Sequence, residues 1–104
     1  MTTLILEIEP QAQRIDFDDR TFTIHLADGR QLTIPLDWYP RLQQATPAER
    51  QNWQLLGDGY AIEWPDLDEH IGITGLLAGK RSGESARSFD RWLTQRRSTS
   101  IQEP

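Results

Sequence analysis

The sequence predicts a single small α+β domain, with a small antiparallel sheet and two or three helices packed on one face. Three observations lead to this prediction. Apolar and polar residues alternate from Gln13 to Leu36, which is typical of half-buried strands. The apolar spacing then becomes helical, and the 104 residues suffice for one domain and not for two. We expect this domain over residues 12–97.

Three strands are expected in the alternating region, joined by tight turns. The turns fall at Asp18-Asp19 and Asp28-Gly29, and Asp-Gly is a strong signal for a hairpin. Pro35 has no backbone N–H, so the third strand is expected to have a free edge. The apolar side chains share one face of this meander, and they are Ile15, Phe17, Phe22, Ile24, Leu26, Leu32, Ile34 and Leu36.

Helical signals follow the meander. Asp37 can cap a helix that starts at Trp38. Thr46 can cap a second, short helix, because Glu49 stands three residues later in a capping-box arrangement. Helices are therefore expected within residues 38–52.

A second hairpin is expected after these helices. Residues 55–56 and 60–64 are its strands, with the glycine-rich turn 57–59 between them, and we expect its second strand to join the meander. Pro65 ends that strand and opens an acidic loop over residues 66–70.

The last third of the chain is expected to be mainly helical. Residues 71–79 predict a short strand and one helical turn. Ser85 can cap a last helix that ends near Arg97, and its apolar stripe is Phe89, Trp92 and Leu93.

The two ends of the chain lie outside this domain. Residues 1–11 are expected to form an N-terminal arm or an extra strand, and residues 98–104 a flexible tail. Residues 1–10 lack the basic start of a signal peptide, and no apolar run approaches the roughly 18 residues of a membrane span. We therefore expect a cytoplasmic protein that has no membrane partner.

Charge is unevenly distributed. The chain carries 16 acidic and 11 basic residues, for a formal net charge of −5, yet the segment from residue 80 onward is basic. Such asymmetry indicates either a partner surface or a solvated helix face. Nucleic acid is the less favoured partner, and it would be contacted through residues 87–97 by Arg87, Arg91, Arg96 and Arg97.

The residues give little support for catalysis. The absence of cysteine excludes disulfides, thiolate zinc sites and a cysteine nucleophile. His25 is expected on the solvent face of a strand, and the sequence brings no serine to it or to His70. Gly75, Gly79 and Lys80 miss the spacing of a phosphate-binding loop. We therefore expect no enzyme activity and no cofactor.

The acidic loop is the best candidate for a cation site, through Asp66, Asp68 and Glu69. Closely spaced oxygen ligands suit a hard cation. The loop lacks the spacing and central glycine of a calcium loop, however, and a transition metal would require more than one nearby imidazole. We expect these carboxylates to cap the next segment or to face water, without a bound metal.

A protein-interaction surface is expected where the third strand ends. Free strand edges recruit other chains, and Trp38, Tyr39, Pro40 and Arg41 follow this edge directly. The alternative is that Trp38 closes the core and a helix covers the edge. We expect Tyr39→Ala to weaken binding to another small protein or to a second copy, with only a slight change in melting temperature.

Several short blocks together resemble a known family. They are residues 27–30 (ADGR), 35–42 (PLDWYPRL), 45–47 (ATP) with Trp53, 57–60 (GDGY), 62–69 (IEWPDLDE), 75–79 (GLLAG) and 82–85 (SGES). Over about residues 12–86, the chain resembles the bacterial domain of unknown function 2442. The resemblance implies a small α+β protein with no established catalytic activity. Family members often form one half of a two-gene module beside a second small protein, in the manner of toxin–antitoxin pairs.

The resemblance ends where some relatives carry a C-terminal helix-turn-helix domain. Only one helix fits after Gly83, so this chain departs from them there. Two functions therefore stay open. One is a non-catalytic protein-interaction module, such as an antitoxin-like partner in a two-gene module. The other is a nucleic-acid-binding regulator that uses the arginine-rich last helix.

Overall fold

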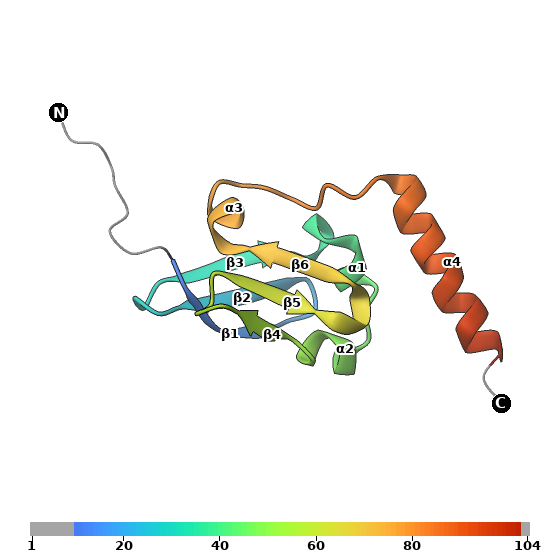
Figure 1. Ribbon diagram of the computed structural model, residues 1–104, viewed down its shortest axis with the longest axis horizontal. Coiled ribbons are helices and arrows are strands. Elements are labelled where there is room, and N and C mark those ends of the chain that lie inside the picture. Colours follow the sequence, from blue (N-terminus) through green and yellow to red (C-terminus); the bar gives the residue numbers. More distant parts are fainter. Residues whose placement is uncertain (1–9, 103–104) are drawn as a thin grey trace.

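A computed structural model describes the backbone of residues 10–102 and the side chains of residues 10–97. The α+β fold class is confirmed (Figure 1). In chain order the elements are β1 (Ala12–Phe17), β2 (Thr21–Leu26), β3 (Gln31–Pro35), a 3-10 turn (Leu36–Trp38), α1 (Pro40–Gln43), α2 (Pro47–Gln51), β4 (Gln54–Leu56), β5 (Ala61–Trp64), a second 3-10 turn (Pro65–Leu67), β6 (Glu69–Gly72), α3 (Ile73–Leu77) and α4 (Ala86–Gln102).

The predicted meander is confirmed as a sheet of order β1-β2-β3. Its strands are antiparallel, with Ile15 opposite Ile24 and Phe22 opposite Ile34. The alternation of the sequence thus places the apolar side chains on one buried face, as a side-chain period of two requires. The pairing shifts between Ala12 and Arg14, so that Ala12 is also buried.

The second hairpin forms a sheet of its own and does not join the meander. Strand β5 pairs with β4 on one side and with β6 on the other, so both of its edges are occupied. The short strand expected within residues 71–79 starts two residues earlier than predicted, because residues 69–70 were assigned to the acidic loop. They are instead the first half of β6.

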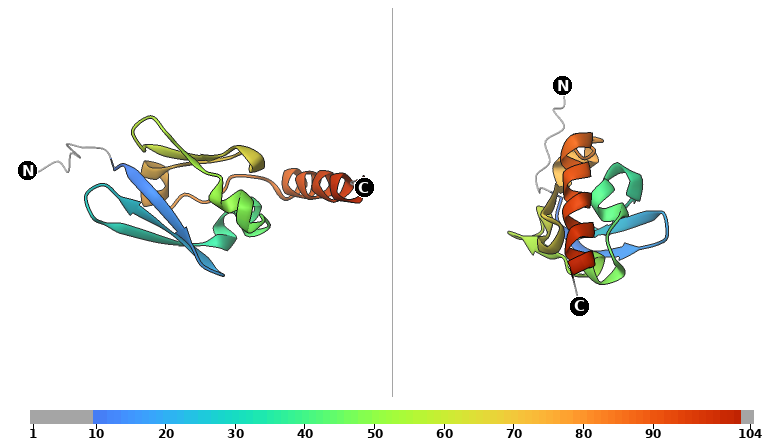
Figure 2. Two further views of the ribbon diagram at one scale, coloured as in Figure 1. Left: turned by 90° about the horizontal axis from the view of Figure 1, so that it is seen from below. Right: turned by 90° about the vertical axis from the view of Figure 1, so that its right-hand side faces the viewer.

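The two sheets lie against each other with the core between them (Figures 1 and 2). Phe22 and Ile24 of the first sheet and Ile62 and Trp64 of the second are fully buried. Phe17 contacts the Trp64 ring edge-on, with 6.4 Å between ring centroids. The backbone N–H of Ala12 donates to the carbonyl of Gly59 at 2.7 Å, which joins β1 to the β4–β5 turn.

The helices α1 and α2 lie at one end of the sheets (Figure 1). The predicted capping box of α2 is confirmed: the Glu49 amide donates to Thr46 Oγ1, and the Thr46 amide donates to the Glu49 carboxylate. The indole N–H of the buried Trp64 donates to the Arg50 carbonyl at 3.0 Å, and this hydrogen bond holds α2 against the core.

The last helix, α4, lies at the same end of the molecule, beyond α1 and α2 (Figures 1 and 2). Ser85 caps it as predicted, since the Ser88 amide donates to Ser85 Oγ at 3.1 Å. The helix continues to Gln102, past the predicted end near Arg97. The flexible tail stays a prediction, and the arm or strand expected over residues 1–11 lies outside the described residues except for its last two positions.

None of the helices over residues 10–102 combines the length and the apolar character that crossing a membrane would require.

Candidate functional site

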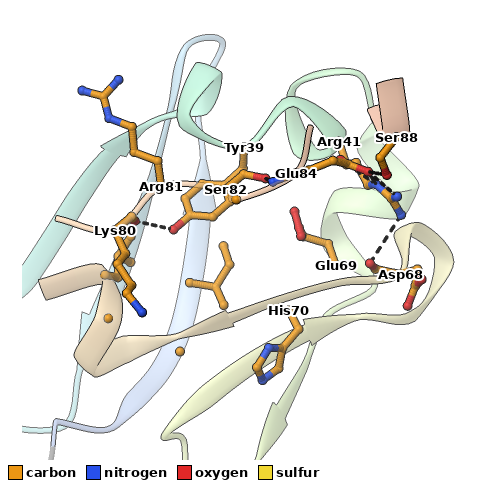
Figure 3. A pocket seen from close by; sticks show the side chains of 15 residues that line it. Tyr39, Arg41, Asp68, Glu69, His70, Lys80, Arg81, Ser82, Glu84 and Ser88 are labelled. Atoms are coloured by element: carbon orange, nitrogen blue, oxygen red, sulfur yellow. Dashed lines mark hydrogen bonds and ion pairs between the residues drawn. The ribbon is translucent and has the colours of Figure 1, made fainter. Parts of the chain in front are cut away.

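A hollow lies beside the edge strand β6 (Figure 3). It has a volume of about 640 Å³. One wall is β6, and the other is formed by Tyr39, Arg41 and the segment 80–84 that leads to α4. We call this hollow the β6 cleft. A second hollow of about 280 Å³ shares Arg41, Asp68 and Ser88 with it and continues to Arg91 and Trp92 on α4.

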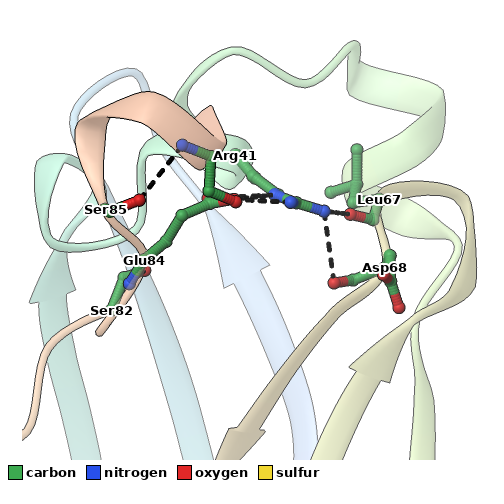
Figure 4. A network of polar contacts seen from close by, with 7 residues as sticks. Arg41, Leu67, Asp68, Ser82, Glu84 and Ser85 are labelled. Atoms are coloured by element: carbon green, nitrogen blue, oxygen red, sulfur yellow. Dashed lines mark hydrogen bonds and ion pairs between the residues drawn. The ribbon is translucent and has the colours of Figure 1, made fainter. Parts of the chain in front are cut away.

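Arg41 connects the two groups of candidate residues that the sequence suggested (Figure 4). Its Nε donates to both carboxylate oxygens of Glu84 at 3.0 Å, and its Nη1 donates to the Leu67 carbonyl at 2.8 Å. The aromatic turn after β3 and the acidic loop before β6 are thereby held together by one guanidinium group. A planar fork of donors suits this double role, which a lysine could not perform.

The Arg41–Glu84 pair is largely shielded from solvent, with 15% and 12% of the two side chains exposed. The hydrogen bonds from Arg41 lower the pKa of Glu84, and the same contact raises the pKa of Arg41. Ser88 adds a hydrogen bond to the carboxylate at 2.7 Å. The pair therefore fixes the first turn of α4 to the body of the protein.

A second ion pair fixes α4 further along. Both terminal nitrogens of Arg96 donate to the Glu49 carboxylate at 2.8 Å, and this pairing lowers the pKa of Glu49. Trp92 lies between the two ion pairs. The guanidinium carbons of Arg41 and Arg96 are 5.2 and 4.6 Å from its ring centroid. Cation–π contacts thus accompany both ion pairs.

We expect acid to release α4 before it unfolds the sheets. The pKa values of Glu49 and Glu84 lie below the ordinary 4.5, so both ion pairs contribute stability above that value. This contribution is lost as the pH falls through the lowered pKa values. The expected result, in a pH titration followed by NMR, is that amide signals of residues 86–97 move at a higher pH than those of β2 and β5.

Glu84→Gln is the matched variant for this titration. This variant should partly release α4 from the rest of the domain at neutral pH. It should also lower the free energy of unfolding by about 1–2 kcal/mol, because a charged hydrogen bond is weakened. If the signals of α4 and of the sheets change together at one pH in the wild-type protein, the two ion pairs are not what holds the helix.

Two carboxylates of the cleft, Asp68 and Glu69, form no ion pair within residues 10–97, and Glu69 is the less exposed of the two. Its Oε2 atom is shielded from solvent and has no hydrogen-bond partner among the described residues. Burial raises the pKa of Glu69, and the backbone amide of His70 and the charge of Arg41 oppose this only in part. In Figure 3 its side chain points from β6 toward the wall formed by Tyr39 and Glu84. Such an arrangement favours a positively charged group in the cleft.

Tyr39 is buried, and the expectation of an exposed aromatic anchor at this position is wrong. Only 5% of the residue is exposed. After Pro35 the chain enters a 3-10 turn, which directs Leu36 and Tyr39 into the core. The ring meets Phe22 edge-on at 6.0 Å, and its hydroxyl donates to the Lys80 carbonyl at 2.9 Å. Burial raises the pKa of the Tyr39 hydroxyl.

The neighbours of Tyr39 are half-buried. Trp38 packs against the core, and the guanidinium carbon of Arg81 lies 4.4 Å from its ring centroid. Pro40 is the first residue of α1. The segment 38–41 is therefore mainly a support for the segment 80–84, and the Trp38 carbonyl accepts a backbone hydrogen bond from Ser82.

The acidic residues of the loop expected over residues 66–70 lie in different places in the structure. Asp66 is exposed and accepts a hydrogen bond from the Asn52 amide at 2.8 Å. Asp68 is exposed in a left-handed conformation, with φ of 51°. Only Asp68 and Glu69 line the β6 cleft. In residues 10–97 no three His, Asp or Glu side chains are arranged to hold a metal ion.

The remaining candidates lie apart from the cleft, except for Arg91 at its continuation. His25 lies on the outer face of the first sheet, and its Nε2 is 2.6 Å from Asp16 Oδ2. On α4, Arg96 is occupied by Glu49, whereas Arg87, Arg91 and Arg97 are exposed and form no ion pair within the described part of the chain.

Sequence reasoning missed the second wall of the cleft. The segment 80–84 has no helical or strand pattern, and Glu84 is one charged residue among many. Its position between a glycine and the capping serine of α4 was the available signal, because a residue just before a helix is held in place by the cap.

The fold and the cleft define a class of small α+β protein: two antiparallel meanders face each other, and a strand edge opens on a polar cleft that an arginine closes at one end. The chain belongs to the family of proteins of unknown function DUF2442, whose family model matches residues 12–82. This confirms the resemblance noted from the sequence blocks.

Two solved structures are similar to this chain. A protein of unknown function from Rhodospirillum rubrum has 25% sequence identity and a TM-score of 0.64, over 74% of this chain and 95% of that one. The uncharacterized protein CV0863 from Chromobacterium violaceum has 22% identity and a TM-score of 0.60, over 83% of this chain and 75% of that one. The curated proteins contain no match to this sequence. The comparisons therefore establish family and fold, and they assign no activity.

Proposed function

We propose that this chain is a non-catalytic protein-interaction module of the bacterial cytoplasm, which binds a second small protein as an antitoxin binds its toxin. The observation that supports this proposal is the free edge of β6 beside the cleft. In the second sheet the strand order is β4-β5-β6, so β6 pairs on one side only.

The hydrogen-bonding direction of each β6 residue follows from one backbone hydrogen bond. The Ile73 amide donates to the Tyr60 carbonyl at 2.9 Å, in the same alignment that pairs Ile71 with Ile62. Residues of an antiparallel strand alternate between bonding inward and outward, so Ile71 bonds to β5. His70 and Gly72 therefore direct their backbone N–H and C=O groups away from the sheet, toward the open edge.

Two of these outward groups, the His70 carbonyl and the Gly72 N–H, are available for another chain. The Gly72 carbonyl accepts the first hydrogen bond of α3, because Gly72 is the N-cap of that helix, and the His70 amide is directed at the Glu69 carboxylate. Exposed strand edges pair with other chains unless they are blocked. The ion-paired state of Arg41, Glu84 and Glu49 fits a structural role for these charged residues.

Co-expression with the product of the adjacent gene tests the proposed function. We expect the two proteins to co-purify in a defined ratio and to remain together at high salt, because backbone hydrogen bonds and apolar contacts depend weakly on ionic strength. The control is Arg87→Ala combined with Arg91→Ala, which should leave the complex unchanged. Separate elution of the two proteins would contradict the proposal.

A nucleic-acid-binding regulator is the second candidate function, favoured by the exposed Arg87, Arg91 and Arg97 of α4. The ion pair of Arg96 with Glu49 removes one of the four arginines that this function was expected to use. If this candidate is correct, the protein binds nucleic acid with an affinity that falls steeply with salt, and the Arg87 and Arg91 variants lose that binding.

A further inference from the structure

We propose that the β6 cleft binds an extended segment of the partner as an added strand, with a lysine or arginine of that segment paired with Glu69. This inference rests on the proposed interaction function and specifies the chemistry of the partner. Addition of a strand to an open edge is a common mode of peptide recognition, in which backbone bonds supply affinity and side-chain pockets supply specificity.

The cleft provides space along the open edge. All four residues of β6 line the hollow of about 640 Å³. At Gly72 an added Cβ would meet nothing within 4 Å, so the face of the strand on that side is open. The second hollow continues from Arg41 and Asp68 to α4, which extends the path for a chain that enters along β6.

The charge of the incoming side chain is set by Glu69. Each cation near this carboxylate has another role or makes no ion pair with it. Arg41 is held by Glu84 and by the Leu67 carbonyl, and Arg81 lies over the Trp38 ring. Lys80 lines the cleft, and the structure gives it no ion pair within residues 10–97.

A cation from outside would supply what Glu69 lacks. An acidic segment would instead place its carboxylate against Glu69 and Asp68, which is unfavourable at close range. The net charge of −5 likewise attracts a basic partner over longer distances. We therefore commit to a basic extended segment.

Gly72→Pro tests the added strand. It removes only the outward backbone N–H, because Gly72 does not donate to β5, and the native φ of −83° is close to the value that proline requires. Gly72→Ala is the matched control, since it adds a Cβ in open space and keeps the N–H. Both variants should fold.

The probe is a library of random heptapeptides displayed on phage and selected on the immobilised full-length chain. We expect the enriched sequences to share a lysine or arginine among residues of high β propensity. Binding of one such peptide, measured by fluorescence polarisation, should weaken by about tenfold or more in Gly72→Pro and remain within about twofold in Gly72→Ala.

Glu69→Gln tests the charge pairing. It keeps the shape of the side chain and removes a poorly solvated charge, so the protein should remain folded. We expect Glu69→Gln to weaken binding of the enriched peptide by about tenfold or more. Replacement of the basic residue of the peptide by glutamine should weaken binding to a similar extent. Equal affinity of the peptide for Glu69→Gln and for the wild type would contradict the proposed charge pairing.

Two outcomes separate this inference from the proposed function. If the protein encoded by the adjacent gene binds, but binds Gly72→Pro and Gly72→Ala equally, the interaction function stands and the β6 site is wrong. If that protein does not bind at all, the interaction function fails, whatever the peptides do. A library that enriches no basic sequence also counts against the inference.

Discussion

Tyr39→Ala is expected to lower the free energy of unfolding by about 3–5 kcal/mol, which is the usual cost of truncating a buried aromatic side chain. The ring is almost fully buried against Phe22, and its removal would leave a cavity at the base of the β6 cleft. The same change releases the Lys80 carbonyl from its hydrogen bond to the hydroxyl. Chemical denaturation monitored by circular dichroism measures the loss directly.

Tyr39→Phe is the control that separates the contribution of the hydroxyl from that of the ring. It keeps the ring and removes only the hydrogen bond to Lys80, so about 1 kcal/mol should be lost. Hydrogen exchange should then be faster at the Ser82 amide, which bonds to the Trp38 carbonyl, and unchanged in β2. A Tyr39→Ala protein as stable as the wild type would show that this side chain is not part of the core.

Gly59→Ala is expected to lower the free energy of unfolding by about 2–5 kcal/mol, because two separate penalties add. Gly59 has φ of +100°, a conformation that costs other residues about 1–2 kcal/mol. In addition, a Cβ at this position would lie 2.3 Å from the Ala12 carbonyl oxygen, and such overpacking costs about 1–3 kcal/mol. The change therefore forces β1 and the β4–β5 turn apart.

Gly29→Ala separates the two contributions. Gly29 has a similar φ of +94°, yet a Cβ there meets nothing within 4 Å. Only the conformational cost of about 1–2 kcal/mol should remain in thermal or urea denaturation. Equal losses in the two variants would mean that the contact between Gly59 and Ala12 adjusts without cost.

Much of the fold was predictable because its signals are local. The alternation through Ile15, Ile24 and Ile34 determines the meander by itself, and the Thr46 and Glu49 pair determines where α2 starts. The hairpin of β4 and β5 was predicted, but the second partner of β5 was not predictable in this way. Pairing is a property of two segments, and the polar residues Glu69 and His70 conceal the strand that occupies the second edge of β5.

The candidate site was predictable in part. Arg41 and Glu69 were selected from sequence, and the structure brings both to one cleft. The burial of Tyr39 was not predicted, because a short turn after Pro35 changes which side chains face inward. The partner of Arg41 was not predicted either, since an ion pair between residues 41 and 84 depends on how the chain returns over β6.

The attachment of α4 has a consequence for how the helix responds to change. The segment 80–84 tethers the helix, so each of its two ion pairs forms at an effective concentration set by the tether and not by the amount of protein. When one pair opens, the other still holds the helix nearby, and closing remains fast. When both open, the face of Trp92 that Arg41 and Arg96 cover becomes accessible to a competitor in solution. The helix thus behaves as a bivalent ligand of its own domain.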